Sequence, residues 1–505
     1  MIFLFFLVMM ICVNLNTTFK LLFHRNSNSL KFTRLYETFS NGMVVLKPKK
    51  DRLFSSNGNP LVYSGAIEHV KNESKLITSD VVEVADNSKN VIGKGFYNPY
   101  SQYRVRLMCT IDEKHLMNSN IDDIISTRLV NAISLRKACN LPNDCTNAYR
   151  LVNGEGDRLS GLIIDVLGRF IVVQSGALWV EKYRKIIEEV LKSSILFSKN
   201  NDDDNNNNNN NNIEKTILIW RKQQDRLNMD GFKDNDNYQD NNNDHHEKYT
   251  KINNELSNEM EASEVKKEEV NYENVLENGI IYKIAPFSGQ KTGFYCDQRD
   301  NRMMIRNLSK NKDVLDCYCY SGGFALNAMK GEAKSIVAID SSHEALTLAK
   351  SNFLLNNIIS SSMDNHNDEN INKNIVENDK ISFLQGDAVK MMRNLHDQQK
   401  LFDIVIVDPP KFAPTQSSLS RAQKKYLQVN EAALNLVRSG GLLLTHSCSA
   451  VVTQRGILKD VIRKAAINTG KKCTVLKTSG PGIDHPVFVG YPEGDYLTSL
   501  LVHVT

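Results

Sequence analysis

Short apolar runs alternate with helical stretches along the chain from Asp313 onward. The stretches between the runs carry apolar residues at helical spacing, as in residues 342–356 and 422–437. We expect the second of these helices to stop at Gly440 and Gly441, where a left-handed conformation costs little. The alternation predicts a doubly wound α/β domain with one seven-stranded sheet. The predicted strands are residues 314–318, 335–340, 381–384, 402–408, 442–447, 473–477 and 496–504.

The pattern upstream of this domain is different. Residues 42–110 consist of short β segments separated by turns, and they predict a small β-rich domain that could close into a barrel. Residues 121–138 have helical spacing. Residues 149–174 resemble a hairpin, with a turn at Gly168 between two apolar strands. A central module of mixed α and β structure is therefore expected.

Three polar segments, rich in Asn and acidic residues, interrupt these patterns. They have too few apolar residues to bury a face, and we expect them to be disordered inserts in surface loops. His245 and His246 lie in one of them and are predicted to be solvated rather than metal ligands. The inserts are residues 199–212, 232–275 and 358–379. The predicted domains are a leader at 1–41, the β-rich domain at 42–110, the central module at 111–300 and the C-terminal domain at 301–505.

The leader has the composition of a targeting segment. Residues 2–13 form an apolar run of twelve, shorter than the roughly 20 residues of a membrane-spanning helix but long enough for the core of a signal peptide. Residues 14–50 are rich in Asn, Ser, Thr, Lys and Arg. A signal followed by a transit segment predicts delivery to a secondary plastid similar to an apicoplast. A plain secretory signal, a mitochondrial destination and a cytoplasmic one are the alternatives, and we expect no membrane association of the mature form.

Charge and cysteine content argue against a chain that is basic throughout, a disulfide-linked framework and a zinc site. The chain has 62 basic and 58 acidic residues, and its first 50 residues hold seven Lys or Arg against one acid. The rest of the chain therefore lacks an overall positive charge, so any nucleic-acid footprint must be local. Nine cysteines without a C-x-x-C pair do not resemble a disulfide framework or a zinc site. We expect reduced thiols and no metal.

Polar residues follow the first three predicted strands of the C-terminal domain. Asp316 precedes the turn 317–324, whose two adjacent glycines open a helix without a dinucleotide or phosphate-loop pattern. Asp340 ends the second strand, where an acid can accept hydrogen bonds from both ribose hydroxyls; its alternative is a helix N-cap. Residues 386–388 end the third strand, where an adenine edge would lie. The series fits S-adenosylmethionine better than a dinucleotide.

The fourth and fifth strands end in the residues with the most specific chemistry. Asp408-Pro-Pro-Lys-Phe412 forms a rigid extended turn, and the sequence 446–449 puts the Cys448 thiol at the same edge of the sheet. Carbon 5 of cytosine is a poor nucleophile until a thiolate adds to carbon 6. Cys448 is the candidate thiolate, and Asp408 the candidate partner of N3. The alternative for Cys448 is a small buried residue, and no second cysteine in the Asp408 motif offers a base for the carbon-5 proton.

Residues 291–302 concentrate polar and aromatic groups just before the C-terminal domain. They predict a segment that closes over a ligand. The alternative is an ion-paired helix start at Asp297 or Asp300.

Together these motifs resemble the large-subunit ribosomal RNA cytosine-C5 methyltransferases that carry an N-terminal PUA domain. One departure is Asn59-Pro-Leu61, where the family has His-Pro-Trp. The resemblance rests on residues 63–65, 95–100, 149–151, 154–157, 291–295, 297–299, 320–324, 408–412, 447–449, 485–486 and 491–494.

The resemblance implies a PUA-like barrel, a small α/β module and a Rossmann-like class I methyltransferase domain. It implies S-adenosylmethionine as cofactor, large-subunit ribosomal RNA as partner, Cys448 as nucleophile and Asp408 as its partner at the base. A monomer or homodimer is expected. The cofactor-binding residues implied are Gln298, Asp316, Tyr318, Tyr320, Gly322, Gly323, Asp340, Asp387, Ala388 and Asp408. The substrate-binding residues implied are Pro409, Pro410, Lys411, Phe412 and Arg299.

Two other functions fit parts of the pattern. An enzyme that methylates a base nitrogen needs no thiol, because nitrogen is already nucleophilic, so the Ser447-Cys448-Ser449 sequence favours carbon 5. An inactive RNA-binding assembly factor would be expected to lose its cofactor or thiol residues, whereas Asp340, Asp408 and Cys448 are all present.

Overall fold

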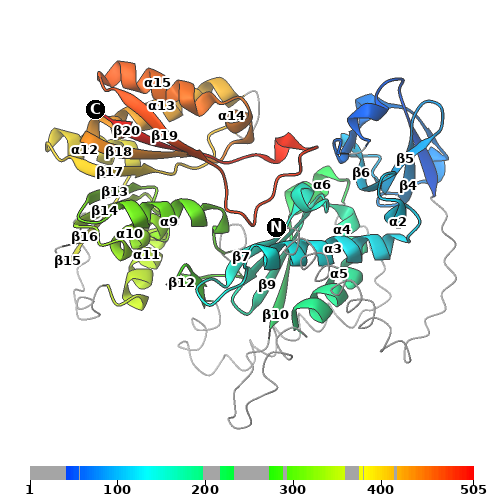
Figure 1. The fold of residues 1–505 in the computed structure, drawn as a ribbon, viewed down its shortest axis with the longest axis horizontal. Coiled ribbons are helices and arrows are strands. Elements are labelled where there is room, and N and C mark those ends of the chain that lie inside the picture. The colour runs from blue at the N-terminus through cyan, green and yellow to red at the C-terminus, as the bar shows by residue number, and fades with distance from the viewer. Residues whose placement is uncertain are drawn as a thin grey trace, which may run out of the picture. The chain divides into compact units, whose positions relative to one another are not determined.

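The computed structural model describes residues 41–55, 57–196, 216–232, 272–287, 293–358, 375–378, 380–413 and 418–505. The predicted leader and most of the three predicted inserts lie outside these ranges. The described strands form three larger sheets and one isolated hairpin (Figure 1). Within the described ranges no helix has the length and apolar character needed to cross a membrane.

The N-terminal domain is a six-stranded sheet around its own apolar core. Its strands are arranged in the order β2-β6-β5-β4-β1-β3. Alternate apolar side chains, such as Val44, Leu46, Val82 and Val84, are fully buried inside it. The prediction of a β-rich N-terminal domain is therefore confirmed. The strands are β1 (Gly42–Leu46), β2 (Leu61–Tyr63), β3 (Ile67–Lys71), β4 (Val81–Ala85), β5 (Val91–Tyr97) and β6 (Tyr103–Thr110).

The central module is a four-stranded sheet with the order β10-β9-β8-β7. The predicted hairpin forms between β8 and β9, where Gly168 takes a φ of 63° in the turn. Phe96 of the N-terminal domain stacks on Trp179, with ring centroids 5.0 Å apart, and joins the two cores. The elements are α2 (Lys114–Met117), α3 (Ile121–Ala138), β7 (Ala148–Asn153), β8 (Leu162–Leu167), β9 (Phe170–Ser175), α4 (Leu178–Lys182), α5 (Arg184–Leu191), β10 (Ile217–Lys222) and α6 (Gln224–Met229).

The C-terminal domain is built on an eight-stranded sheet with the order β15-β16-β14-β13-β17-β18-β20-β19. Helices α9, α10 and α11 contribute to the core on one face, and α12, α13 and α15 to the core on the other (Figure 1). The strands are β13 (Asp313–Cys317), β14 (Ser335–Asp340), β15 (Ile375–Asn378), β16 (Ile381–Gln385), β17 (Phe402–Val407), β18 (Val437–Ser447), β19 (Cys473–Ser479) and β20 (Thr498–Val504). The helices are α9 (Arg299–Leu308), α10 (Gly323–Lys330), α11 (His343–Leu355), α12 (Ala388–Asp397), α13 (Leu419–Leu436), α14 (Ala450–Gln454) and α15 (Ile457–Thr469). The doubly wound class I fold is as predicted.

Two predicted inserts end in ordered strands, which is a correction. Residues 375–378 form β15, which pairs antiparallel with β16 and raises the strand count from seven to eight. Residues 273–275, the end of the second insert, begin β11 (Glu273–Glu277), which pairs with β12 (Ile280–Ile284). Val275 is buried opposite Tyr282 in that hairpin, and this burial explains why the segment is ordered.

The hairpin of β11 and β12 belongs to the C-terminal domain, so this domain begins earlier in the chain than the sequence predicted. Asn352 of α11 accepts a hydrogen bond from the Lys283 amide at 2.7 Å, and Asn356 bonds both backbone groups of Ile281. Tyr282 also lies in the core that covers one face of the C-terminal sheet. The C-terminal domain therefore includes the hairpin and α9, whereas the sequence placed its start at residue 301.

Helix α13 ends earlier than expected. It stops at Leu436, and Val437 is already extended and paired with Phe402 of β17. Arg438, the next residue, forms ion pairs with Asp403 and Asp313. Gly440 does take a positive φ, 82°, but within the irregular start of β18 rather than at a helix end.

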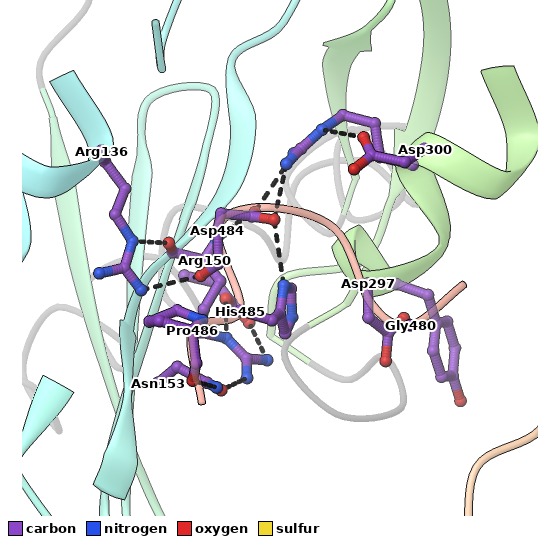
Figure 2. Close-up of polar contacts among 12 residues, drawn as sticks. Arg136, Arg150, Asn153, Asp297, Asp300, Gly480, Asp484, His485 and Pro486 are labelled. Carbon is purple, nitrogen blue, oxygen red and sulfur yellow. Dashed lines mark hydrogen bonds and ion pairs between the residues drawn. The ribbon is translucent and has the colours of Figure 1, made fainter. Parts of the chain in front are cut away.

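A long connection between β19 and β20, residues 480–497, joins the C-terminal domain to the central module (Figure 2). Its Asp484 is fully buried and accepts hydrogen bonds from Arg299 at 2.6 and 3.2 Å and from the Arg150 amide at 2.8 Å. Arg136 donates to the Asp484 carbonyl at 2.8 Å, and Asn153 donates to the Pro486 carbonyl at 3.0 Å. We call residues 480–497 the bridging loop.

Burial alone would raise the pKa of Asp484, but hydrogen bonds and the charges of His485 and Arg299 hold this pKa well below its usual range. A carboxyl whose folded-state pKa is depressed stabilises the fold above its unfolded pKa of about 3.9. This contribution is lost as pH falls through the lower, folded-state pKa. The buried pair therefore stabilises the attachment of the loop at neutral pH.

Replacement of Asp484 by Asn should lower the free energy of unfolding by about 3 kcal/mol at pH 7, because Arg299 would then be buried without its counter-charge. Urea denaturation monitored by fluorescence would measure the change. The difference from the unmodified chain should shrink as the pH falls from about 4 toward the lower folded-state pKa, because the unfolded chain then binds a proton at Asp484 that the folded chain does not. Asp300→Asn is the matched control, because Asp300 lies 3.9 Å from the same Arg299 but is 57% exposed. Equal effects of the two changes would contradict this account.

Candidate functional site

The carboxyl ends of five parallel strands meet at one edge of the C-terminal sheet. Strands β16, β14, β13, β17 and β18 are parallel neighbours in that order. Asp316 and Asp340 lie at the ends of β13 and β14, Asp408 directly follows β17, and Cys448 directly follows β18. The topology thus gathers residues that are up to 132 positions apart in the chain at the edge where open α/β sheets bind ligands.

The turn after β13 has an unusual backbone. Tyr318, Tyr320 and Gly322 all have positive φ, at 64°, 48° and 77°. Asp340 Oδ2 accepts a hydrogen bond of 2.9 Å from the Tyr320 amide and so stabilises this conformation. Gly322 precedes α10, and a Cβ there would lie 3.2 Å from Ala349. The chain thus turns sharply before α10, and Gly322 adopts its left-handed conformation without the strain that a side chain would cause.

Asp316 is the observation that best tests whether the predicted cofactor fits. Its Oδ2 accepts from the Ala325 amide at 2.9 Å, whereas its buried Oδ1 has no hydrogen-bond partner among the described residues. Burial raises the pKa of Asp316 to about 8, and the charges of Asp408 and Asp340 act in the same direction. Three carboxyl groups near one buried turn favour a positively charged ligand. S-adenosylmethionine carries such charge, so these residues fit it.

The structure also gives Asp340 and Asp387 local roles. Asp340 Oδ1 accepts from the Ser342 amide, and Ser342 itself caps α11, so Asp340 is not the N-cap. Asp387 is the N-cap of α12, where its Oδ1 accepts from the Lys390 amide at 2.9 Å. The contacts predicted for Asp340 with ribose and for Asp387 with adenine remain predictions.

The Asp408 turn and the Cys448 segment are bonded to one another. Cys448 Sγ lies 4.0 Å from the Pro409 carbonyl oxygen. Ser449 donates to the Ala413 carbonyl at 2.7 Å. Ser447 on the other side donates to the Tyr426 hydroxyl at 3.0 Å. The structure therefore brings together the two motifs that were predicted to hold the nucleophile and its partner.

Aromatic side chains surround this pair of motifs. Phe412 packs on Tyr426, with centroids 4.9 Å apart, and Lys425 lies over the Phe412 ring. Tyr295 makes an edge contact with Tyr320 at 5.4 Å. Burial and then the charges of Asp297, Asp408 and Cys448 raise the pKa of Tyr295 to about 12. Tyr295 and Tyr426 were not among the predicted site residues; Tyr295 lies in the polar and aromatic segment that was expected to close over a ligand.

Gln298 orients Asp408. Its Nε2 donates to Asp408 Oδ2 at 3.0 Å and lies 3.3 Å from His446 Nδ1. Its Oε1 accepts from Asn301 at 2.7 Å, and Asn301 also donates to Ser499 at 3.0 Å. Every polar atom of this amide therefore has a partner. Gln298 was expected to contact the cofactor; the structure shows its bond to the catalytic candidate Asp408, and the cofactor contact stays a prediction.

His446 belongs to the same buried network and had no predicted role. Its Nδ1 lies 2.6 Å from Ser499 Oγ, and burial lowers the pKa of the ring to about 3. The imidazole is therefore neutral at physiological pH. It lies two positions before Cys448, on the same side of the extended chain, and this spacing was the signal that could have revealed it.

Arg299 does not lie where a substrate residue was expected. Its side chain is 4% exposed and paired with Asp484. This placement does not support the predicted contact with substrate, because the guanidinium is buried and already paired with the Asp484 carboxylate. It agrees better with the alternative of an ion-paired helix start, since α9 begins at Arg299. Pro410 and Lys411 are exposed, whereas Pro409 is buried. Cys317 and Cys319 are also buried.

Comparison with known proteins identifies both end domains. Residues 44–110 match a PUA-like domain, and residues 257–469 match an S-adenosylmethionine-dependent methyltransferase domain. The fold resembles two solved methyltransferases. One was crystallised with SAH, with a TM-score of 0.64 and 17% identity over 91% of this chain and 99% of the other. The second comes from Streptococcus mutans, with a TM-score of 0.63 and 18% identity over the same shares.

Two curated relatives cover nearly the whole chain. Ribosomal RNA large subunit methyltransferase I of Alteromonas mediterranea is 30% identical over 463 residues, which is 92% of this chain and 98% of the relative. The enzyme of the same name from Escherichia coli is 29% identical over 462 residues, or 92% of this chain and 99% of the relative. The chain thus belongs to the ribosomal RNA large subunit methyltransferase I family of S-adenosylmethionine-dependent enzymes.

Proposed function

We propose that this protein forms 5-methylcytidine in large-subunit ribosomal RNA and that a bond between Cys448 and carbon 6 of the target cytosine is an intermediate. The observation that carries this proposal is the contact between the Cys448 segment and the Asp408 turn, in which Cys448 Sγ lies 4.0 Å from the Pro409 carbonyl. A cytosine that enters there would meet a thiol and a carboxyl group from two neighbouring strands.

Each residue of the proposed site has a separate role in the reaction. The Cys448 thiolate attacks carbon 6 of the base, and the new bond makes carbon 5 nucleophilic. Asp408, in its protonated form, donates to N3 and so stabilises the negative charge that shifts onto the ring as the thiolate adds. Gln298 fixes Asp408 Oδ2 at 3.0 Å, so that the carboxyl is oriented before the base arrives. Once carbon 5 carries the methyl group, its proton passes to a base in the surrounding water. The electron pair left behind restores the double bond between carbons 5 and 6, and Cys448 leaves as a thiolate.

S-adenosylmethionine, when bound, supplies the electrophilic methyl group. Asp316, Asp340 and the backbone of the 318–322 turn are the groups that would hold it. The target base must leave its stack to reach the edge of the sheet. The exposed Pro410 and Lys411 and the half-buried Phe412 are placed to receive the flanking RNA.

The PUA-like match at residues 44–110, together with similarity to ribosomal RNA large subunit methyltransferase I over 92% of the chain, supports an RNA substrate. We propose a secondary plastid as the destination on the composition of the leader, which lies outside the described residues.

Incubation of large-subunit ribosomal RNA with the protein and methyl-labelled S-adenosylmethionine should give labelled 5-methylcytidine, detected by nucleoside mass spectrometry. Cys448→Ala should lower the rate about 10³-fold or more, because carbon 5 is then not activated. Cys473→Ala is the matched control, since Cys473 is also half-buried but lies at the start of β19. Label on a base nitrogen, or full activity of Cys448→Ala, would refute the carbon-5 mechanism.

Gln298→Leu should reduce kcat about tenfold or more and leave KM for RNA unchanged, because Asp408 would lose its orienting hydrogen bond while the RNA surface stays intact. Steady-state methylation of the same RNA measures both constants. Gln223→Leu is the control, since Gln223 makes a comparable amide hydrogen bond, 2.8 Å long, to Gln174 in the central module. An unchanged kcat for Gln298→Leu, or the same loss in both variants, would show that the contact with Asp408 does not matter.

A further inference from the structure

A pocket of about 400 Å³ lies where the bridging loop meets the N-terminal domain. The N-terminal domain contributes Asn59, Tyr63, Gln102 and Tyr103 to its walls, and the loop contributes Tyr491 and Glu493. Neither the predicted methyl-transfer site nor its cofactor residues take part. The pocket is of the size that small ligands occupy in proteins, and it needs both domains to exist.

The loop is attached firmly enough to serve as a wall. Its Gly490 comes so close to the N-terminal domain that an added Cβ would lie 2.2 Å from the Asn57 carbonyl oxygen. Arg158 of the central module lies 5.2 Å from the centroid of the Phe488 ring. Gln454, at the end of α14, donates to the Glu493 carbonyl at 3.0 Å. Tyr491 and Glu493 are therefore held from three sides, and the last contact connects the pocket to the helix that follows Cys448.

The opposite wall is also fixed. Tyr63 makes an edge contact with Phe54, with centroids 5.7 Å apart. Asn59 Oδ1 accepts from the Leu61 amide at 2.8 Å, which leaves the NH₂ end of this side chain as the group that can donate to a ligand. The ring of Tyr103 is 43% exposed at the pocket mouth. The pocket thus has aromatic faces that do not need to rearrange when a flat ligand enters.

The chemistry of the lining selects a class of ligand. Three tyrosines offer rings on which a base can stack, which is how proteins bind unpaired nucleotides. Glu493 accepts hydrogen bonds and cannot donate them when ionised, so it favours a base edge with two adjacent donors. Guanine presents such an edge through its N1–H and N2 amino group, whereas uracil presents one N–H between two oxygens. The carboxylate would also repel a phosphate, so the base rather than the backbone belongs inside.

We infer that this pocket holds one unstacked guanine of the RNA substrate and so positions the RNA relative to Cys448. The inference rests on the proposed RNA substrate but not on methyl transfer. It is therefore tested by binding alone, with no methyl donor present.

Fluorescence anisotropy with the full chain would compare the labelled hexaribonucleotides UUGUUU and UUUUUU. The guanine-containing strand should bind about fivefold more tightly or better, as expected for a two-point contact with a base edge. Glu493→Gln should remove this preference, because the amide presents a donor to guanine. Tyr491→Ala should weaken UUGUUU binding about fivefold or more through loss of stacking, and Tyr491→Phe should restore it. Glu68→Gln is the control, since Glu68 is exposed on β3 of the same domain.

Equal binding of the two strands, or a guanine preference that survives Glu493→Gln, would overturn the inference. Displacement of UUGUUU by guanosine 5′-monophosphate at equal concentration would also overturn it, because the pocket would then be a site for a free nucleotide. If the unmodified protein shows no guanine preference but methylates ribosomal RNA normally, the pocket is refuted and the proposed function stays intact. If the guanine preference is present but the protein methylates no RNA, the pocket is supported and the proposed function is refuted.

Discussion

The buried pair between Arg299 and Asp484 is the contact on which the other parts of the structure depend. Arg299 is the first residue of α9 and directly follows Gln298, the side chain that orients Asp408. Asp484 lies in the bridging loop, which carries Tyr491 and Glu493 to the N-terminal domain. The same carboxylate accepts from the Arg150 amide in the central module. The Asp484 carboxylate of the bridging loop therefore bonds both to the first residue of α9 and to the sheet of the central module.

A pair of this kind is not expected to add much net stability, since the cost of removing two charges from water offsets most of their attraction. Its effect is on geometry. In the observed arrangement of the loop, Arg299, the Arg150 amide and the Arg136 side chain all bond to Asp484 at once. These contacts fix the loop that connects the PUA-like domain to the C-terminal domain.

Much of the architecture could be predicted from the sequence, because it depends on local periodicity. The strands of the C-terminal sheet, the helix at 121–138 and the hairpin at Gly168 follow from the spacing of their own apolar residues. The order of Asp316, Asp340, Asp408 and Cys448 at successive strand ends was visible for the same reason. The predictions were wrong where distant partners determine the local structure. Val437 is extended and pairs with Phe402 rather than continuing the helix, and residues 375–378 form a strand beside β16.

The roles of individual polar residues were harder to predict. The family resemblance implied that Arg299 contacts the substrate, and the sequence could not show that its buried partner is Asp484, which lies 185 residues away. Gln298 lies 110 residues before Asp408, and His446 is buried beside Gln298, Phe324 and Ser499 of β20. Such long-range polar pairs leave no periodic signal, so sequence reasoning could name candidate reacting groups but not the residues that orient them.

The bond between Cys448 and the substrate is the central claim, and trapping it tests the claim most directly. In a ribosomal RNA substrate that contains 5-fluorocytidine, carbon 5 carries no proton that can leave after methyl transfer, so the carbon–sulfur bond should persist. The account predicts a denaturation-resistant protein–RNA complex that forms only with S-adenosylmethionine present, with the RNA attached to Cys448 in peptide mass spectrometry. Attachment at another cysteine, or methylation of unmodified RNA at normal rates with no complex from the fluorinated RNA, would contradict it.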